Sequence, residues 1–271
     1  MARPGQTEKG ESMKLGLVTY NLAKDWDLGT IIANCEETGF SGVELRTTHA
    51  HRVEVDLKPQ KRAEIKELFA ASKVELVGLG SAFEYDAVDQ GEVRQNIEGT
   101  KEYIQLASDL GVGGVKVRPN KVHVDEGVEI EKTLEQIGLA LRECGEFGSA
   151  QGVEVRLEVH GRVTCQPANI RKILDYADHD NVFACWNSNM DDIEDDSIDS
   201  NFELLKEKIR LVHINELWSS YPWRRLFKLL QLSGYEGFCL AEIPASEDAI
   251  RLMHYYRSLW HALAGLEPEN A

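Results

Sequence analysis

The 271-residue sequence predicts a single-domain α/β protein folded as a (β/α)₈ barrel, also called a TIM barrel, on two observations. Short runs rich in Val, Ile, Leu or Phe alternate eight times with longer segments of helical periodicity, and this order is typical of a parallel sheet. Glycines also separate helices from the following strands, in "ETGFSGVEL", "DLGVGGVKV", "AQGVEVRL" and "LSGYEGFCL". Glycine is the usual residue where a helix ends in a left-handed turn.

The predicted strands span residues 14–20, 42–46, 75–80, 114–119, 154–160, 182–187, 209–215 and 237–243. The predicted helices span residues 28–38, 60–72, 92–110, 130–151, 167–176, 201–206, 221–232 and 247–263. An open doubly wound sheet is the rival architecture, but no GxGxxG motif follows a predicted strand and no second domain is apparent. We therefore expect one barrel domain over 13–271 and a disordered extension or tag remnant over the polar residues 1–12.

The composition is that of an ordinary globular protein, with 42% hydrophobic and 28% charged residues. A net charge of -16 argues against partners with anionic phosphates, both nucleic acid and membrane surfaces, and leaves a small-molecule partner open. No apolar run approaches the roughly 18 residues of a membrane span. The five cysteines include no CxxC pair, which favours a reducing compartment and a cytoplasmic location. Association into a homo-oligomer stays open.

Charged and polar side chains recur at the C-terminal ends of the predicted strands. Side chains alternate between the two faces of a strand, so in "EVRLEVH" the residues Arg156, Glu158 and His160 share the face opposite to the apolar one. The same parity predicts this inward-facing set: Glu44, Arg46, Lys116, Arg118, Arg156, Glu158, His160, Asn187, His213, Asn215 and Glu242. Burying unpaired charges costs several kcal/mol, and barrel enzymes keep their chemistry at this end. We therefore expect an active site here, with Arg46 and Arg156 as the structural members.

Four strand ends, "LEVHG", "CWNSN", "LVHINE" and "CLAEI", carry a family resemblance. The chain resembles the xylose isomerase-like barrel family, whose members include sugar and sugar-phosphate isomerases and epimerases. In that family Glu, Asp, His and Glu from strands five to eight hold one divalent metal. By position, the resemblance implies Glu158, Asn187, His213 and Glu242 as ligands of Mn²⁺, Mg²⁺ or Zn²⁺. It also implies Glu158 and Glu242 as the catalytic pair that exchanges a substrate proton.

The sequence departs from the family pattern at the sixth and seventh strands. Asn187 replaces the expected aspartate, so its amide oxygen can bind a cation but adds no charge. Without a metal, Lys116 and Arg118 could supply the charge that polarises a substrate carbonyl. Asn215 and Glu216 stand where the family's ketose epimerases carry an arginine. We expect substrate contacts from this set: Glu44, Lys116, Arg118, His160 and Asn215.

These residues leave several functions open. The first is a sugar isomerase or epimerase, and the second a lyase or dehydratase acting on a keto-sugar in the same pocket. A third, an abasic-site nuclease, is disfavoured by the acidic charge and the shortage of histidine ligands. A fourth is a non-catalytic, metal-free sugar-binding barrel, which Asn187 favours and the two retained glutamates oppose.

Three further features are interpreted chiefly as structural. His49 and His51, in the loop after the second predicted strand, are read as loop histidines, with substrate contact as the less favoured alternative. Trp186 should pack outward beneath a helix. The acidic run 191–199 is expected to be a surface loop, with a lid over the site as the alternative.

Overall fold

The computed structural model describes residues 13–266 and shows eight parallel strands closed into a barrel, in the order β1 to β8. Each strand pairs with its neighbours in the sequence, and β1 pairs with β8 to close the barrel. The strands are Lys14–Val18 (β1), Gly42–Arg46 (β2), Glu75–Glu84 (β3), Gly114–Arg118 (β4), Glu154–Glu158 (β5), Val182–Asn187 (β6), Ile209–Ile214 (β7) and Phe238–Ala241 (β8). The predicted fold class is confirmed. The expected extension, residues 1–12, lies outside the described residues.

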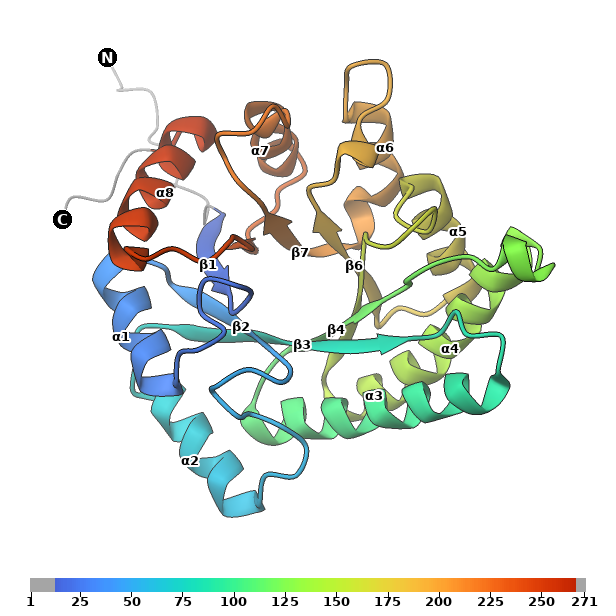
Figure 1. Cartoon of the computed structure of the whole chain (residues 1–271), viewed down its shortest axis with the longest axis horizontal. Helices are drawn as coiled ribbons and strands as arrows, with labels where there is room; N and C mark the ends of the chain where they lie inside the picture. Colours follow the sequence, from blue (N-terminus) through green and yellow to red (C-terminus); the bar gives the residue numbers. More distant parts are fainter. Residues whose placement is uncertain (1–12, 267–271) are drawn as a thin grey trace, which may run out of the picture.

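Eight helices surround the strands in a ring (Figure 1). They are Leu28–Thr38 (α1), Pro59–Ala70 (α2), Gln90–Leu110 (α3), Ile130–Gln151 (α4), Pro167–Ala177 (α5), Asp199–Leu205 (α6), Trp223–Leu232 (α7) and Ala249–Ala264 (α8). Gly39, Gly111 and Gly152 end α1, α3 and α4 in the left-handed conformation that their sequence context predicts. None of the described helices is long and apolar enough to cross a membrane.

The strand boundaries differ from the sequence prediction mainly at the C-terminal rim. The strands β1, β4, β5, β7 and β8 end one or two residues earlier than predicted, because the chain turns into the loops there. The strand β3 instead continues beyond the predicted end at residue 80 as far as Glu84. This extension follows a register shift against β4 that places Glu84 opposite Arg118, with which it forms an ion pair of 2.6 Å.

The apolar core has two parts, one outside the barrel and one inside. Most buried apolar side chains lie between the strands and the surrounding helices. A small cluster fills the barrel interior: Val18, Val77, Cys185, Leu211, Phe238 and Leu240. Gly42 makes room for this cluster, since a Cβ there would lie 2.3 Å from the Phe238 ring and 2.6 Å from Val77. The charged side chains of the strand ends therefore rest on an apolar floor.

Candidate active site

A cavity of about 320 Å³ opens among the C-terminal ends of the strands. Its lining residues are Tyr20, Arg46, Lys116, Arg118, Glu158, His160, Asn215 and Glu242. All but Tyr20 belong to the inward-facing set that strand parity predicts. Tyr20 is the lining residue outside that set. It shares the parity of Gly16 and Val18, so side-chain alternation is the signal that places it on the inward face.

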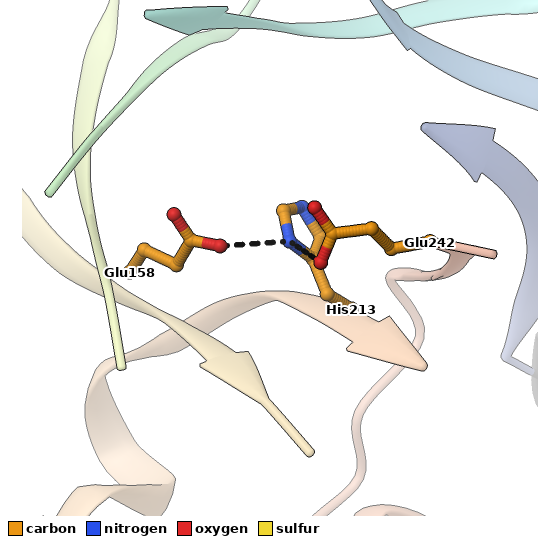
Figure 2. Close-up of side chains that lie close together, drawn as sticks. All are labelled: Glu158, His213 and Glu242. Atoms are coloured by element: carbon orange, nitrogen blue, oxygen red, sulfur yellow. Dashed lines mark ion pairs between the residues drawn. The ribbon is translucent and has the colours of Figure 1, made fainter. Parts of the chain in front are cut away.

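Glu158 from β5, His213 from β7 and Glu242, just after β8, converge at the base of this cavity. The Nδ1 atom of His213 lies 3.4 Å from Oε1 of Glu158 and 3.8 Å from Oε2 of Glu242. One ligand atom from each of the three residues lies within 4.8 Å of the others. Figure 2 shows both carboxylates facing the same nitrogen of the imidazole, Nδ1. Three groups able to bind a cation therefore meet where parity and the family pattern placed them.

Two further buried charges adjoin this trio. The ammonium of Lys116, on β4, lies 2.8 Å from Oε2 of Glu158, and both side chains are 4% exposed. The carboxylate of Glu44, on β2, lies 3.4 Å from Nε2 of His213. Glu44 is fully buried and is not among the residues that line the cavity. The structure thus places Glu44, expected at the substrate, behind the histidine instead.

The surroundings of Glu158 and Glu242 shift the pKa values of the two carboxyl groups in opposite directions. Burial alone would raise the pKa of Glu158, but the Lys116 ammonium and His213 outweigh it and hold that pKa well below its usual range. Burial raises the pKa of Glu242, and the charge of Glu158 adds to the effect. Burial alone would lower the pKa of Lys116, yet Glu158 and Glu44 raise it above its ordinary value. Glu158 is therefore ionised at neutral pH beside a charged lysine.

Asn187, at the end of β6, completes the base of the site. Its amide Nδ2 donates to Oε1 of Glu158 over 3.2 Å, while its buried Oδ1 has no hydrogen-bond partner. Neither ring nitrogen of His213 makes a hydrogen bond of good geometry. Lys116 contacts Oε2 of Glu158 and leaves Oε1 facing the histidine. The two ring nitrogens of His213 and the Asn187 oxygen are buried without hydrogen-bond partners, and such atoms are costly to bury unless something binds them. Together with the two carboxylates that face His213, these donors fit a divalent cation.

The remaining predicted contacts occupy the rim of the cavity. Asn215 donates from Nδ2 to the Ser188 carbonyl over 3.0 Å. The His160 side chain is exposed, and Arg118 is paired with Glu84. Arg46, interpreted from the sequence as structural, lines the cavity and forms no ion pair with any described carboxylate.

Arg156 lies on the same inward face but deeper than the cavity. Its guanidinium lies 2.8 Å from Glu154 and donates to the Val77 carbonyl over 3.0 Å. The structural interpretation therefore fits Arg156 and does not fit Arg46.

The loop features have mixed outcomes. His51 is buried and bonds the Arg46 carbonyl at 2.8 Å, and neither it nor His49 lines the cavity. Trp186 packs outward against Phe202, as parity predicted. The expectation of a surface loop at 191–199 is wrong for Asp192, which is completely buried and accepts a hydrogen bond of 2.8 Å from Tyr221. The burial of Asp192 could not be predicted from the acidic run alone, because its partner Tyr221 comes from the loop between β7 and α7.

Comparison with known proteins supports the fold independently. The family model described as xylose isomerase-like TIM barrel matches residues 32–259. The D-psicose 3-epimerase of Clostridium cellulolyticum H10 is 15% identical, with a TM-score of 0.78 over 93% of this chain and 99% of that one. The IOLI protein with a binding zinc atom is 18% identical, with a TM-score of 0.76 over 93% of this chain and 98% of that one.

A dehydratase also shares the fold. The probable 3-DHS dehydratase AsbF of Bacillus anthracis is 16% identical, with a TM-score of 0.67 over 91% of this chain and 98% of that one. None of the curated proteins matches the sequence. At these identities the likeness extends to the fold alone, so the chemistry rests on the side chains of this chain.

Proposed function

The chain belongs to the xylose isomerase-like TIM barrel family, and from this premise we propose that it is a carbohydrate epimerase or isomerase that uses Glu158 and Glu242 for proton transfer. The observation that carries the proposal is the convergence of these two carboxylates on the same ring nitrogen of His213, Nδ1, at 3.4 and 3.8 Å (Figure 2). One carboxylate can remove a proton from the carbon beside a carbonyl, and the other can return a proton on the opposite face. The cavity above them, of about 320 Å³, is large enough for a monosaccharide.

We further propose that a divalent cation binds at this point, held by Glu158, His213 and Glu242, with the Asn187 oxygen as a fourth donor. Such a cation would stabilise the negative charge that develops on substrate oxygens during proton removal. Oxygen and imidazole donors are compatible with Mn²⁺, Mg²⁺ or Zn²⁺ and do not discriminate among them. With Asn187 in place of an acid, two carboxylates rather than three would face the cation.

Lys116 has its own part in the chemistry. Its buried ammonium keeps Glu158 ionised, and therefore able to accept a proton, while its position on the cavity wall allows it to donate a hydrogen bond to a substrate oxygen. His160 and Asn215 lie at the rim, where they can contact substrate hydroxyls. The catalytic groups are thus fixed on strand ends, and the groups that contact hydroxyls lie above them.

A lyase acting on a keto-sugar is the second candidate, and His160 is the observation that favours it. The His160 ring is exposed at the rim, has no hydrogen-bond partner among the described residues, and lies on the cavity wall beside Glu158. It could protonate a departing hydroxyl after Glu158 removes a neighbouring proton. Elimination lowers the product mass by one water, whereas epimerisation leaves the mass unchanged, so mass spectrometry separates the two reactions.

The test is solvent exchange in D₂O with Mn²⁺ present, using D-fructose, D-tagatose, D-psicose and L-ribulose as probes and NMR as the readout. The wild type should incorporate deuterium at a carbon next to the carbonyl of at least one ketose. Glu158→Gln and Glu242→Gln should each abolish incorporation, while Glu131→Gln, at an exposed surface pair, should not change it. Incorporation that persists in either active-site variant contradicts the mechanism. Sugar binding without deuterium incorporation would indicate a non-catalytic, sugar-binding barrel.

A further inference from the structure

Three cationic side chains line the cavity, and only two of them have a carboxylate partner. Lys116 is paired with Glu158 at 2.8 Å, and Arg118 with Glu84 at 2.6 Å. Arg46 forms no ion pair and no side-chain hydrogen bond with any described residue. Its charge lies at the wall of the catalytic cavity without a carboxylate in ion-pair contact among the described residues.

The position of Arg46 is nevertheless fixed. Its backbone N–H donates to Oγ1 of Thr19 over 2.8 Å, and its carbonyl is bonded by the His51 ring at 2.8 Å. Its guanidinium lies over the ring of Tyr20, 5.2 Å from the centroid. Stacking on a ring leaves the N–H groups at the edge of a guanidinium free. The site therefore presents a planar cation that is held in place and has unused donors.

A neutral sugar does not account for this arrangement. A half-buried guanidinium loses part of its hydration, and hydroxyl groups supply no opposite charge to offset that loss. Glu242 lines the same cavity, and the charge of Arg46 works against the rise of its pKa that burial causes, but the two form no ion pair, and Glu242 is committed to proton transfer in the proposed function. The guanidinium fork matches carboxylate and phosphate groups, which it binds through two parallel hydrogen bonds.

We propose that the substrate is a monosaccharide derivative carrying an anionic group, a carboxylate or a phosphate, and that Arg46 binds this group. The cavity volume of about 320 Å³ limits the substrate to a single sugar unit. This assignment rests on the proposed function and narrows its substrate class. It also gives an acidic protein a local point of attraction for an anionic substrate, because Arg46 is the cation of the cavity wall that no described carboxylate pairs with.

The test compares matched sugars by isothermal titration calorimetry, without any requirement for turnover. Each set shares one configuration and differs only at the terminal carbon, as in D-fructose, D-fructuronate and D-fructose 6-phosphate. Sets built on tagatose, glucose and galactose extend the comparison to other stereochemistry. The proteins are the wild type, Arg46→Gln, Arg46→Lys and the control Arg225→Gln, an exposed arginine paired with Asp199 on the outer helices.

In at least one set the wild type should bind an anionic sugar about tenfold or more tightly than its neutral counterpart. Arg46→Gln should remove that preference, Arg46→Lys should retain part of it, and Arg225→Gln should leave it intact. The preferred member of the set, uronate or phosphate, identifies the anion. No preference in any set, or a preference that survives in Arg46→Gln, overturns the inference. Deuterium exchange on a neutral ketose with no anion preference would overturn this inference alone, whereas an anion preference without deuterium exchange on the preferred anionic sugar would overturn the proposed function alone.

Discussion

The Nε2 atom of His213 lies 3.4 Å from Oε1 of Glu44, and both side chains are 1% exposed. The other ring nitrogen, Nδ1, faces Glu158 and Glu242. A carboxylate behind an imidazole fixes the ring orientation and the nitrogen that carries the proton. Glu44 does not line the cavity, so we expect it to affect the proposed chemistry only through its contact with His213.

Replacing Glu44 by Gln should therefore weaken cation binding while the fold is kept. An amide preserves the shape but lacks the charge that orients the imidazole, and loss of such a partner costs roughly 10- to 100-fold in metal affinity or activity. Calorimetric titration with Mn²⁺ measures the affinity, and ¹⁵N NMR of the His213 ring reports the tautomer directly. Unchanged ring shifts together with unchanged affinity would show that Glu44 has no positioning role.

Lys116→Met should make stability dependent on a divalent cation. The substitution leaves Glu158 buried without its partner, and breaking a buried pair typically costs about 3–5 kcal/mol. Mn²⁺ can then replace the lost positive charge, so urea unfolding should show the variant recovering much of its stability when MnCl₂ is added. Lys172→Met is the control, because Lys172 pairs with Glu131 on the exposed surface. A variant as stable as wild type, or one that binds Mn²⁺ more weakly, would contradict this account.

Asp192 should make the protein less stable as the pH rises through the neutral range. Burial raises the pKa of this carboxyl from 3.8 to about 7, while hydrogen bonds from Tyr221 and Asn189 oppose the shift. The folded state then binds the proton more tightly than the unfolded state, so the free energy of unfolding falls as the pH rises from 3.8 to about 7. Above about pH 7 the contribution of Asp192 to the free energy of unfolding no longer changes with pH.

Asp192→Asn should remove this slope and stabilise the protein at pH 8 by on the order of 1 kcal/mol or more. Urea unfolding between pH 4 and roughly pH 8 measures the difference from wild type at each pH. For Asp195→Asn, on the exposed part of the same loop, the free energy of unfolding should depend on pH as it does in the wild type. If the two variants have the same pH profile, Asp192 is not protonated in the folded state.

A methyl group added at Gly42, inside the barrel, should destabilise the protein, whereas one added at Gly29, on helix α1, should not. A Cβ at Gly42 would lie 2.3 Å from the Phe238 ring, whereas the nearest atom to one at Gly29 is 3.7 Å away. Gly42→Ala should cost about 1–3 kcal/mol, and Gly29→Ala should be neutral or stabilise by up to about 1 kcal/mol. Thermal and urea unfolding measure both. Effects of the same sign would show that the interior adapts more readily than its close contacts suggest.

The alternation of side chains along each strand was enough to predict most of the residues that face the inside of the barrel. Glu158, His213 and Glu242 could be placed on one inward face because side-chain alternation is a property of the backbone and needs no partner. The helix ends at Gly39, Gly111 and Gly152 were predictable for a similar reason, since the left-handed conformation favours glycine locally.

Pairings between strands could not be predicted in this way. The contact of Lys116 with Glu158 and the isolation of Arg46 both depend on how the closed barrel staggers its strands, which no single strand encodes. Asp192 was missed because its partner, Tyr221, lies in a different loop. The limits of the sequence reading therefore lie at contacts between segments that are distant along the chain.

The buried charges also affect how the chain folds during its synthesis on the ribosome. Glu44 and Lys116 are synthesised long before His213 and Glu242, and strand β8 must arrive before the barrel can close against β1. Until then a nascent barrel would have to desolvate Glu44 without the imidazole that faces it, which is costly. The charged cluster thus penalises premature compaction, and we expect productive folding of the nascent chain to await nearly complete synthesis.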